Sequence, residues 1–326
     1  MLRQYLKFTT QRITHAPPSL VHHMSTNAFD QATALEHLPN IDSHPLIAAN
    51  VDRATSFLTP QTTAFRTKQT VSPDWSISHH PNGGYTAAMC ISAARNVQPY
   101  RDHLTLTCHY NASLIENEPA IFLANVLKEG QQMSTVSVGV YQQGHQKVSF
   151  TGTFGTLNKM QGVSRDSRSD GIGTPIEAMD GIEACTDTLW QGFKALNVGT
   201  LYSKGLKVHV PTNSPFIETL LAGKDQGEPR IDAYVEFLDG REPCLRSLAL
   251  FNDCLPPAVL NYAGMSSWVP TIEYTLHCYR RPAPGPMKLS FRADQIVNGV
   301  ATVNGEVQDS NGNLCSVSRQ MCTIRV

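Results

Sequence analysis

The sequence predicts an α+β protein of two tandem units, each an antiparallel sheet wrapped around one helix, which together form a pseudo-dimer within one chain. Three observations support this fold class. Segment 85–94 is small and apolar on all sides, which indicates a helix enclosed by other elements. Several segments with strand patterns follow it directly. The pattern then recurs at an offset of 168 residues, which relates Thr107 to Thr275, His109 to His277, and Gly144 to Gly312.

The first 28 residues form a separate segment of basic character. They carry Arg3, Lys7 and Arg12, whereas the first acidic residue of the chain is Asp30. This composition fits either a disordered tail or a mitochondrial targeting segment. We therefore expect a cytoplasmic protein, with the mitochondrial matrix as the alternative location.

The first unit is predicted to span residues 29–160. A short helix or turn is expected at 32–37 and a strand at 70–77. The Asn82-Gly83-Gly84 turn leads into the enclosed helix, because glycine permits a tight turn and the first N–H groups of a helix have no partner within it. Period-2 alternation or continuous apolar character predicts strands at 103–111, 120–129, 134–142 and 147–155.

A polar linker or insertion is predicted at 161–200, and the second unit at 201–326. A largely apolar helical stretch is expected at 242–262. The two prolines Pro256 and Pro257 must kink or end that helix, because proline lacks the N–H that a helix needs. The strands of this unit are predicted at 206–210, 231–237, 268–277, 287–294, 301–308 and 314–326.

Composition excludes several classes of function. With 41% hydrophobic and 16% charged residues the chain has the composition of an ordinary globular protein, and a net charge of −1 gives no attraction for nucleic acid. The chain contains no run of about 18 apolar residues, so no membrane span is predicted. The eight cysteines form no CxxC pair and the histidines no HExxH pattern, so we expect reduced thiols and no metal site. No phosphate loop or GxGxxG motif predicts a nucleotide cofactor, and we expect no cofactor.

The two copies differ at three polar positions. At the common offset Asp253 corresponds to Tyr85, Thr271 to His103, and Gln320 to Gly152. Because the polar trio occurs only in the second copy, we expect one active site per chain rather than two.

Several motifs occur together in a fixed order along the chain. They are Trp75, Asn82-Gly83-Gly84-Tyr85, Asn252-Asp253, Trp268-Val269-Pro270-Thr271-Ile272-Glu273, and Asp309 to Gly312 followed by Ser316-Val317-Ser318-Arg319-Gln320. In this order and spacing the sequence resembles the type II acyl-CoA thioesterases, the double-hotdog members of the thioesterase-like superfamily. The resemblance covers roughly residue 70 to the C-terminus, with the linker as a variable insertion.

The resemblance implies a double-hotdog fold that hydrolyses an acyl-CoA or acyl-carrier thioester by direct attack of water. An Asp, a Thr and a Gln position the water in that family, which would give these roles to Asp253, Thr271 and Gln320. The start of the first helix is the candidate for acyl or oxyanion contacts, since helix N–H groups favour negative charge. The expected substrate-binding residues are Asn82, Gly83, Gly84, Tyr85 and Trp268. Hotdog pairs often associate further, so a homo-oligomer is one expected assembly.

Each of these residues also has a structural interpretation. Asp253 could cap a helix that begins at the two prolines, Thr271 could be an ordinary strand residue, and Gln320 could be solvated. The neighbouring pair His79-His80 lies beside the glycine turn and is a candidate for substrate contact.

Two other functions stay open at the level of sequence. The same fold could hydrate, dehydrate or cyclise a biosynthetic intermediate, which would call for an Asp/His pair on the helix after the glycine turn, whereas His79-His80 precedes that turn. The protein could also bind acyl groups without catalysis, if the two prolines move Asp253 out of line.

Overall fold

The computed structural model describes residues 27–52, 58–164, 185–186, 200–211, 227–263 and 269–324. The first unit contains α1 (Ala28–Ala32), β1 (Leu35–Leu38), α2 (Pro45–Asn50), β2 (Thr63–Thr67), η1 (Pro73–Trp75), β3 (Ser76–Ile77), β4 (His80–Pro81), α3 (Gly83–Arg95), β5 (Asp102–Tyr110), β6 (Ile121–Glu129), β7 (Ser134–Gln142), β8 (His145–Gly155) and η2 (Leu157–Lys159). The rest contains β9 (Cys185–Thr186), η4 (Leu201–Gly205), β10 (Leu206–Pro211), β11 (Arg230–Phe237), α6 (Leu245–Phe251), α7 (Leu260–Ala263), β12 (Thr271–Cys278), β13 (Met287–Val297), β14 (Val300–Gln308) and β15 (Leu314–Thr323).

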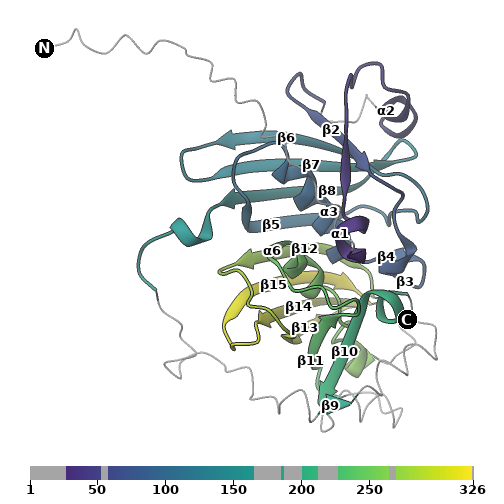
Figure 1. The fold of residues 1–326 in the computed structure, drawn as a ribbon. Coiled ribbons are helices and arrows are strands. Elements are labelled where there is room, and N and C mark those ends of the chain that lie inside the picture. Colours follow the sequence, from purple (N-terminus) through teal and green to yellow (C-terminus); the bar gives the residue numbers. More distant parts are fainter. Residues whose placement is uncertain are drawn as a thin grey trace, which may run out of the picture.

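One antiparallel sheet runs through both halves of the described chain. Its thirteen strands follow the order β1-β2-β6-β7-β8-β5-β12-β15-β14-β13-β11-β10-β9. Figure 1 shows the N-terminal half, purple to teal, above the green-to-yellow C-terminal half, with β5 and β12 side by side where the halves meet. Apart from β9, each strand of one half has a counterpart at the same distance from this junction.

The junction confirms the internal repeat of 168 residues. Thr107 on β5 pairs with Thr275 on β12, and their hydroxyl oxygens lie 3.1 Å apart. The two copies of this strand therefore run antiparallel around the pair that relates them. Both copies also share a β-bulge, after His103 in β5 and after Thr271 in β12. A bulge at equivalent positions shows that the two units fold alike in local detail.

Helix α3 is enclosed, as its composition predicts. Every residue from Gly84 to Ala94 is buried, and the helix packs on α6 and on strands of its own unit. The two helices approach each other closely at Gly84. A Cβ atom there would overlap the Ala249 carbonyl oxygen and would lie 2.8 Å from Leu250 Cα. The glycine is needed because only a residue without a side chain lets the helices meet this closely.

The second helical stretch is broken where proline requires it. Helix α6 ends at Phe251, and α7 begins only at Leu260, after Pro256 and Pro257. The expectation that these prolines kink or end the helix is confirmed, whereas one continuous helix over 242–262 is wrong.

Two further expectations in the first unit are wrong. The segment 70–77 is not one strand, because Pro73 starts the 3₁₀ turn η1, whose Asp74 N–H donates to the Ser72 hydroxyl at 3.3 Å. The edge strands are instead β1 and β2, of which β1 overlaps the helix or turn expected at 32–37. These strands have only four and five residues, and their sequences show too little alternation of apolar and polar residues to predict a strand.

Some expectations fall on residues outside the described ranges. They include the tail 1–28 except its last two residues, most of the linker 161–200, and Trp268. No helix in the described part of the chain has the length and apolar character to cross a membrane.

We expect Gly84→Ala to lower the free energy of unfolding by about 1–3 kcal/mol, since the added methyl forces α3 and α6 apart. Urea unfolding followed by circular dichroism measures the change. An unfolding midpoint equal to that of the natural protein would show that the helices do not depend on this close contact.

Candidate active site

A cavity of about 1000 Å³ lies between the two units. The first unit lines it with the start of α3, including Asn82 and Gly83. The second unit lines it with Asp253, Thr271 and Gln320. The three residues that the sequence singles out therefore share one cavity, although 67 positions separate the first from the last.

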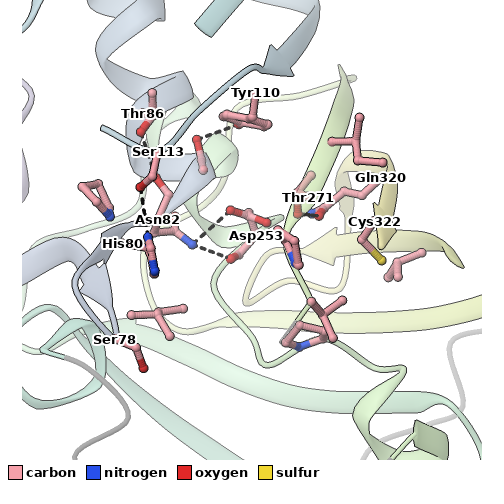
Figure 2. A pocket seen from close by; sticks show the side chains of 18 of the residues that line it. Ser78, His80, Asn82, Thr86, Tyr110, Ser113, Asp253, Thr271, Gln320 and Cys322 are labelled. Carbon is pink, nitrogen blue, oxygen red and sulfur yellow. Dashed lines mark hydrogen bonds between the residues drawn. The ribbon is translucent and has the colours of Figure 1, made fainter. Parts of the chain in front are cut away.

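The carboxylate of Asp253 lies at the start of helix α3. Its Oδ2 accepts hydrogen bonds from the Gly84 N–H at 2.7 Å and from Asn82 Nδ2 at 3.0 Å. Figure 2 shows Asn82 reaching towards Asp253 from the opposite side of the site. The N-terminal end of a 13-residue helix carries partial positive charge, which favours an anion in this position. The residue thus does cap a helix, but one in the other half of the chain.

The backbone around Asp253 is held by three side-chain donors. The carbonyl oxygens of residues 252, 253 and 254 accept from Gln320 Nε2 at 3.0 Å, Asn82 Nδ2 at 2.7 Å and the Tyr202 hydroxyl at 2.7 Å, respectively. Carbonyl groups beyond the end of a helix have no partner within it, so these donors satisfy the groups that the prolines leave free. They fix Asp253 in place, despite the interruption of its helix.

Thr271 and Gln320 meet on adjacent strands. The Thr271 hydroxyl donates to Gln320 Oε1 at 3.0 Å, and Figure 2 shows this pair beside Asp253. Gln320 points inward because its neighbours Arg319 and Met321 are exposed on the opposite face of β15. With its carbonyl end on Thr271 and its amide end on the Asn252 carbonyl, the side chain has one orientation only.

Burial raises the pKa of Asp253 to about 6, against an ordinary value of 3.8. Hydrogen bonds from Gly84, Gln320 and Asn82 act in the opposite direction and limit the rise. A carboxyl with a pKa near 6 is ionised at neutral pH, yet it is a stronger base than an exposed Asp.

The other expected contact residues divide into three groups. Asn82 and Gly83 line the cavity, and Gly84 binds Asp253 through its N–H. Tyr85 does not line the cavity: it is fully buried, stacks on Trp75 at a centroid distance of 6.1 Å, and its hydroxyl donates to the Ala32 carbonyl at 3.1 Å. Its place is therefore in the core.

Sequence reasoning missed three residues that support the site. Asn252 fixes the end of α6, where its Nδ2 donates to the Leu248 carbonyl and to Ser316 Oγ. Tyr202 holds the backbone after Asp253, and the Tyr110 hydroxyl donates to the Gly83 carbonyl at 2.8 Å. Only Asn252 carried a signal, as part of the Asn-Asp motif. The two tyrosines lie in segments where no pattern indicates which way a hydroxyl points.

The position in the first copy that corresponds to Thr271 is buried in the core. His103, the counterpart of Thr271, pairs with Phe154 across β5 and β8 and is 1% exposed. Burial, with the charges of Arg95 and Arg246, lowers the pKa of His103 to about 3, so its ring is neutral. Gly152 brings no functional group where Gln320 stands in the second copy. The difference between the copies thus leaves only the second with the polar trio.

Within the described ranges, no three His, Cys, Asp or Glu side chains gather in a way that would hold a metal ion. Besides Asp253, Thr271 and Gln320, polar side chains such as Asn82, Thr86 and Tyr110 line the cavity.

Two family descriptions match the sequence over successive parts. Residues 71–155 match the acyl-CoA thioesterase N-terminal domain, and residues 202–324 match the acyl-CoA thioesterase C-terminal domain. Together they cover well over half of the chain. The chain belongs to the acyl-CoA thioesterase family. This thioesterase is a thioester hydrolase, as the motifs predict.

Solved structures confirm the double-hotdog fold. A thioesterase II candidate from Thermobifida fusca has 21% identity and a TM-score of 0.68, over 89% of this chain and all of the other. A hot dog protein from Alicyclobacillus acidocaldarius has 17% identity and a TM-score of 0.69, over 93% and 99%. An acyl-CoA thioesterase II from Mycobacterium marinum has 16% identity and a TM-score of 0.62, over 91% and 98%. A search of curated protein sequences found no match to this thioesterase.

The raised pKa of Asp253 has a consequence for stability. Because the folded state binds this proton more tightly than the unfolded state does, the group favours folding below about pH 4, and this contribution is lost as pH rises through about 6. We expect the melting temperature of Asp253→Asn, relative to the natural protein, to increase between pH 4 and pH 7. The corresponding change in the free energy of unfolding, across the full titration, is on the order of 3 kcal/mol.

Calorimetry of both proteins at several pH values measures this difference, with Asp294→Asn on the surface as the matched control. If the melting temperatures of Asp253→Asn and the natural protein differ by the same amount at every pH, Asp253 titrates like an exposed residue.

Proposed function

We propose that this thioesterase hydrolyses the thioester by direct attack of a water molecule that Asp253, Thr271 and Gln320 hold and activate. The observation that carries the proposal is the meeting of a buried, basic carboxylate with an oriented Thr-Gln pair on one cavity wall.

The hydrogen bonds within the trio leave groups that can bind one water molecule. The Thr271 hydroxyl gives its proton to Gln320, so its oxygen is free to accept one from water. Gln320 Nε2 donates one N–H to the Asn252 carbonyl, and its amide also hydrogen-bonds the Asp253 carboxyl, so Gln320 orients the base. A water that donates to Asp253 and to Thr271 would have a lone pair directed at the thioester carbonyl carbon.

The reaction then needs no covalent enzyme intermediate. Asp253 takes a proton from the water as the oxygen–carbon bond forms, which gives a tetrahedral oxyanion. The carbon–sulfur bond breaks, the thiolate leaves with the bonding electron pair, and the proton on Asp253 passes to the sulfur. The products are a carboxylic acid and a free thiol, and Asp253 returns to its ionised form.

Stabilisation of the oxyanion comes from the start of helix α3 in this proposal. The Gly84 N–H, part of the region expected to make acyl or oxyanion contacts, donates to Asp253. The positive end of α3 still favours negative charge at this wall of the cavity.

We expect Asp253→Asn to lower kcat by about 10²–10⁴-fold, since the base is lost while the side-chain volume is kept. Thr271→Val should lower kcat by about 10²-fold, because the water loses one of the groups that orient it. Release of free thiol from a series of acyl-CoA substrates measures both effects.

Thr275→Val is the matched control for Thr271→Val, because Thr275 lies on the same strand but bonds Thr107 at the junction. It should retain the kcat of the natural protein. Thiol release by Asp253→Asn at the natural rate would exclude Asp253 as the base.

A further inference from the structure

The hydroxyl of Tyr110 starts a chain of hydrogen bonds that leads to Asp253. Tyr110 is the last residue of β5 and lines the cavity. Its hydroxyl donates to the Gly83 carbonyl at 2.8 Å, and Figure 2 shows Tyr110 above Asp253 in the site. The Gly83 carbonyl and the Gly84 N–H belong to one peptide group. Since that N–H donates to Asp253 Oδ2 at 2.7 Å, the hydroxyl and the carboxylate bind opposite ends of the same amide.

Tyr110 and Asp253 both pack against the bare backbone of Gly83. A Cβ atom at Gly83 would lie 2.9 Å from Asp253 Oδ2 and 3.0 Å from the Tyr110 hydroxyl oxygen. Because glycine has no side chain, the ring and the carboxylate can both approach the same peptide group. The chain from hydroxyl to carboxylate is therefore short.

Hydrogen bonds in such a chain strengthen one another. A donor on the carbonyl oxygen of an amide polarises the amide, which makes its N–H a better donor. A better N–H donor stabilises the ionised carboxylate and so lowers its pKa. Among the hydrogen bonds that lower the pKa of Asp253, the one from Gly84 has the largest effect. Burial of the hydroxyl raises the pKa of Tyr110 well above its ordinary value of 10.0, so its proton stays available for donation.

We propose that Tyr110 is a positioning residue for the hydrolysis, which acts through the Gly83–Gly84 peptide group and strengthens the hydrogen bond that keeps Asp253 ionised at neutral pH. The proposal rests on the proposed role of Asp253 as the base. The hydroxyl acts on the base through the backbone and makes no contact with the reacting atoms. Without it, Asp253 binds its proton more tightly, and the thioesterase loses activity on the acidic side of its pH range.

The described thiols and hydroxyls that interact electrostatically with Asp253 stay neutral near pH 6. Burial raises the pKa of each; they are Tyr110 and Cys108 on β5, Tyr202 on η4, Cys254, Tyr274 on β12, and Cys322 on β15. On β12, the charge of Glu273 also raises the pKa of Cys108. His80 is the remaining titratable side chain of the cavity wall, and its Nδ1 lies 3.3 Å from Ser113 Oγ. A rate profile can include His80, so the test observes Asp253 directly.

The test is a ¹³C NMR titration of the protein labelled at its aspartate carboxyl carbons, in which the Asp253 signal is the one that Asp253→Asn lacks. Tyr110→Phe keeps the ring and removes the hydroxyl. It should raise the pKa of Asp253 by about 0.2–0.6, because cooperativity contributes roughly 10–30% of a hydrogen bond to a charged group. The acid limb of kcat/KM for acyl-CoA hydrolysis should move to higher pH by the same amount, while KM above pH 8 stays within about twofold.

Tyr274→Phe is the matched control. Tyr274 is buried, and its hydroxyl donates to the Ala249 carbonyl of helix α6 at 3.0 Å. This variant therefore loses a buried hydroxyl near Asp253 but leaves the Gly83–Gly84 peptide group as it is. It should leave the pKa of Asp253 unchanged.

The NMR titration separates this proposal from the hydrolysis on which it rests. A pKa of Asp253 that stays the same in Tyr110→Phe, or that rises as much in Tyr274→Phe, would overturn the proposal. A raised KM with an unchanged acid limb in Tyr110→Phe would also overturn it, and would show that the hydroxyl contacts the substrate. The carboxyl titration does not depend on turnover, so absence of thiol release by the natural protein would contradict the hydrolysis alone.

Discussion

The bond between the Asp253 carboxylate and the Gly84 N–H connects the two halves of this thioesterase at its active site. It requires a glycine where α3 and α6 approach closely, because any side chain there would separate the helices. It also places a carboxylate at the positive end of a buried helix, which limits the cost of burying the charge. The position of the base therefore depends on how the two units pack.

The interruption of the second helix allows the backbone around Asp253 to be held in one position. Once Pro256 and Pro257 end the helical run, the carbonyl groups around Asp253 need donors, and Asn82, Tyr202 and Gln320 supply them from three separate elements. A residue that could have been displaced by the prolines is instead held from several directions. This also removes the physical reason for expecting a non-catalytic acyl-binding protein.

Duplication explains both the symmetry of the sheet and the asymmetry of its chemistry. The bulges after His103 and Thr271 show that the two copies share one backbone design. Yet one position carries a buried neutral ring and the other a hydroxyl on a cavity wall. A common fold thus supports one copy as a packed core and the other as a reaction site.

The sequence predicts most of this architecture, because the repeat offset places strands, turns and the trio in corresponding positions. Prediction from the sequence fails for features that do not produce a periodic pattern of apolar and polar residues. Strands β1 and β2 are too short to show alternation, and Tyr85 carries a family motif although its ring packs in the core on Trp75. The supporting roles of Tyr110 and Tyr202 depend on tertiary contacts between distant segments.

The most direct test of direct water attack is a single turnover in ¹⁸O-labelled water, with enzyme in excess of an acyl-CoA. Our account predicts one ¹⁸O atom in the carboxylate product of the first turnover and none in Asp253, as measured by mass spectrometry of the acid and of the peptide that contains this residue. Unlabelled product from the first turnover, with ¹⁸O found later in Asp253, would show that the carboxylate attacks the thioester itself and would contradict the account.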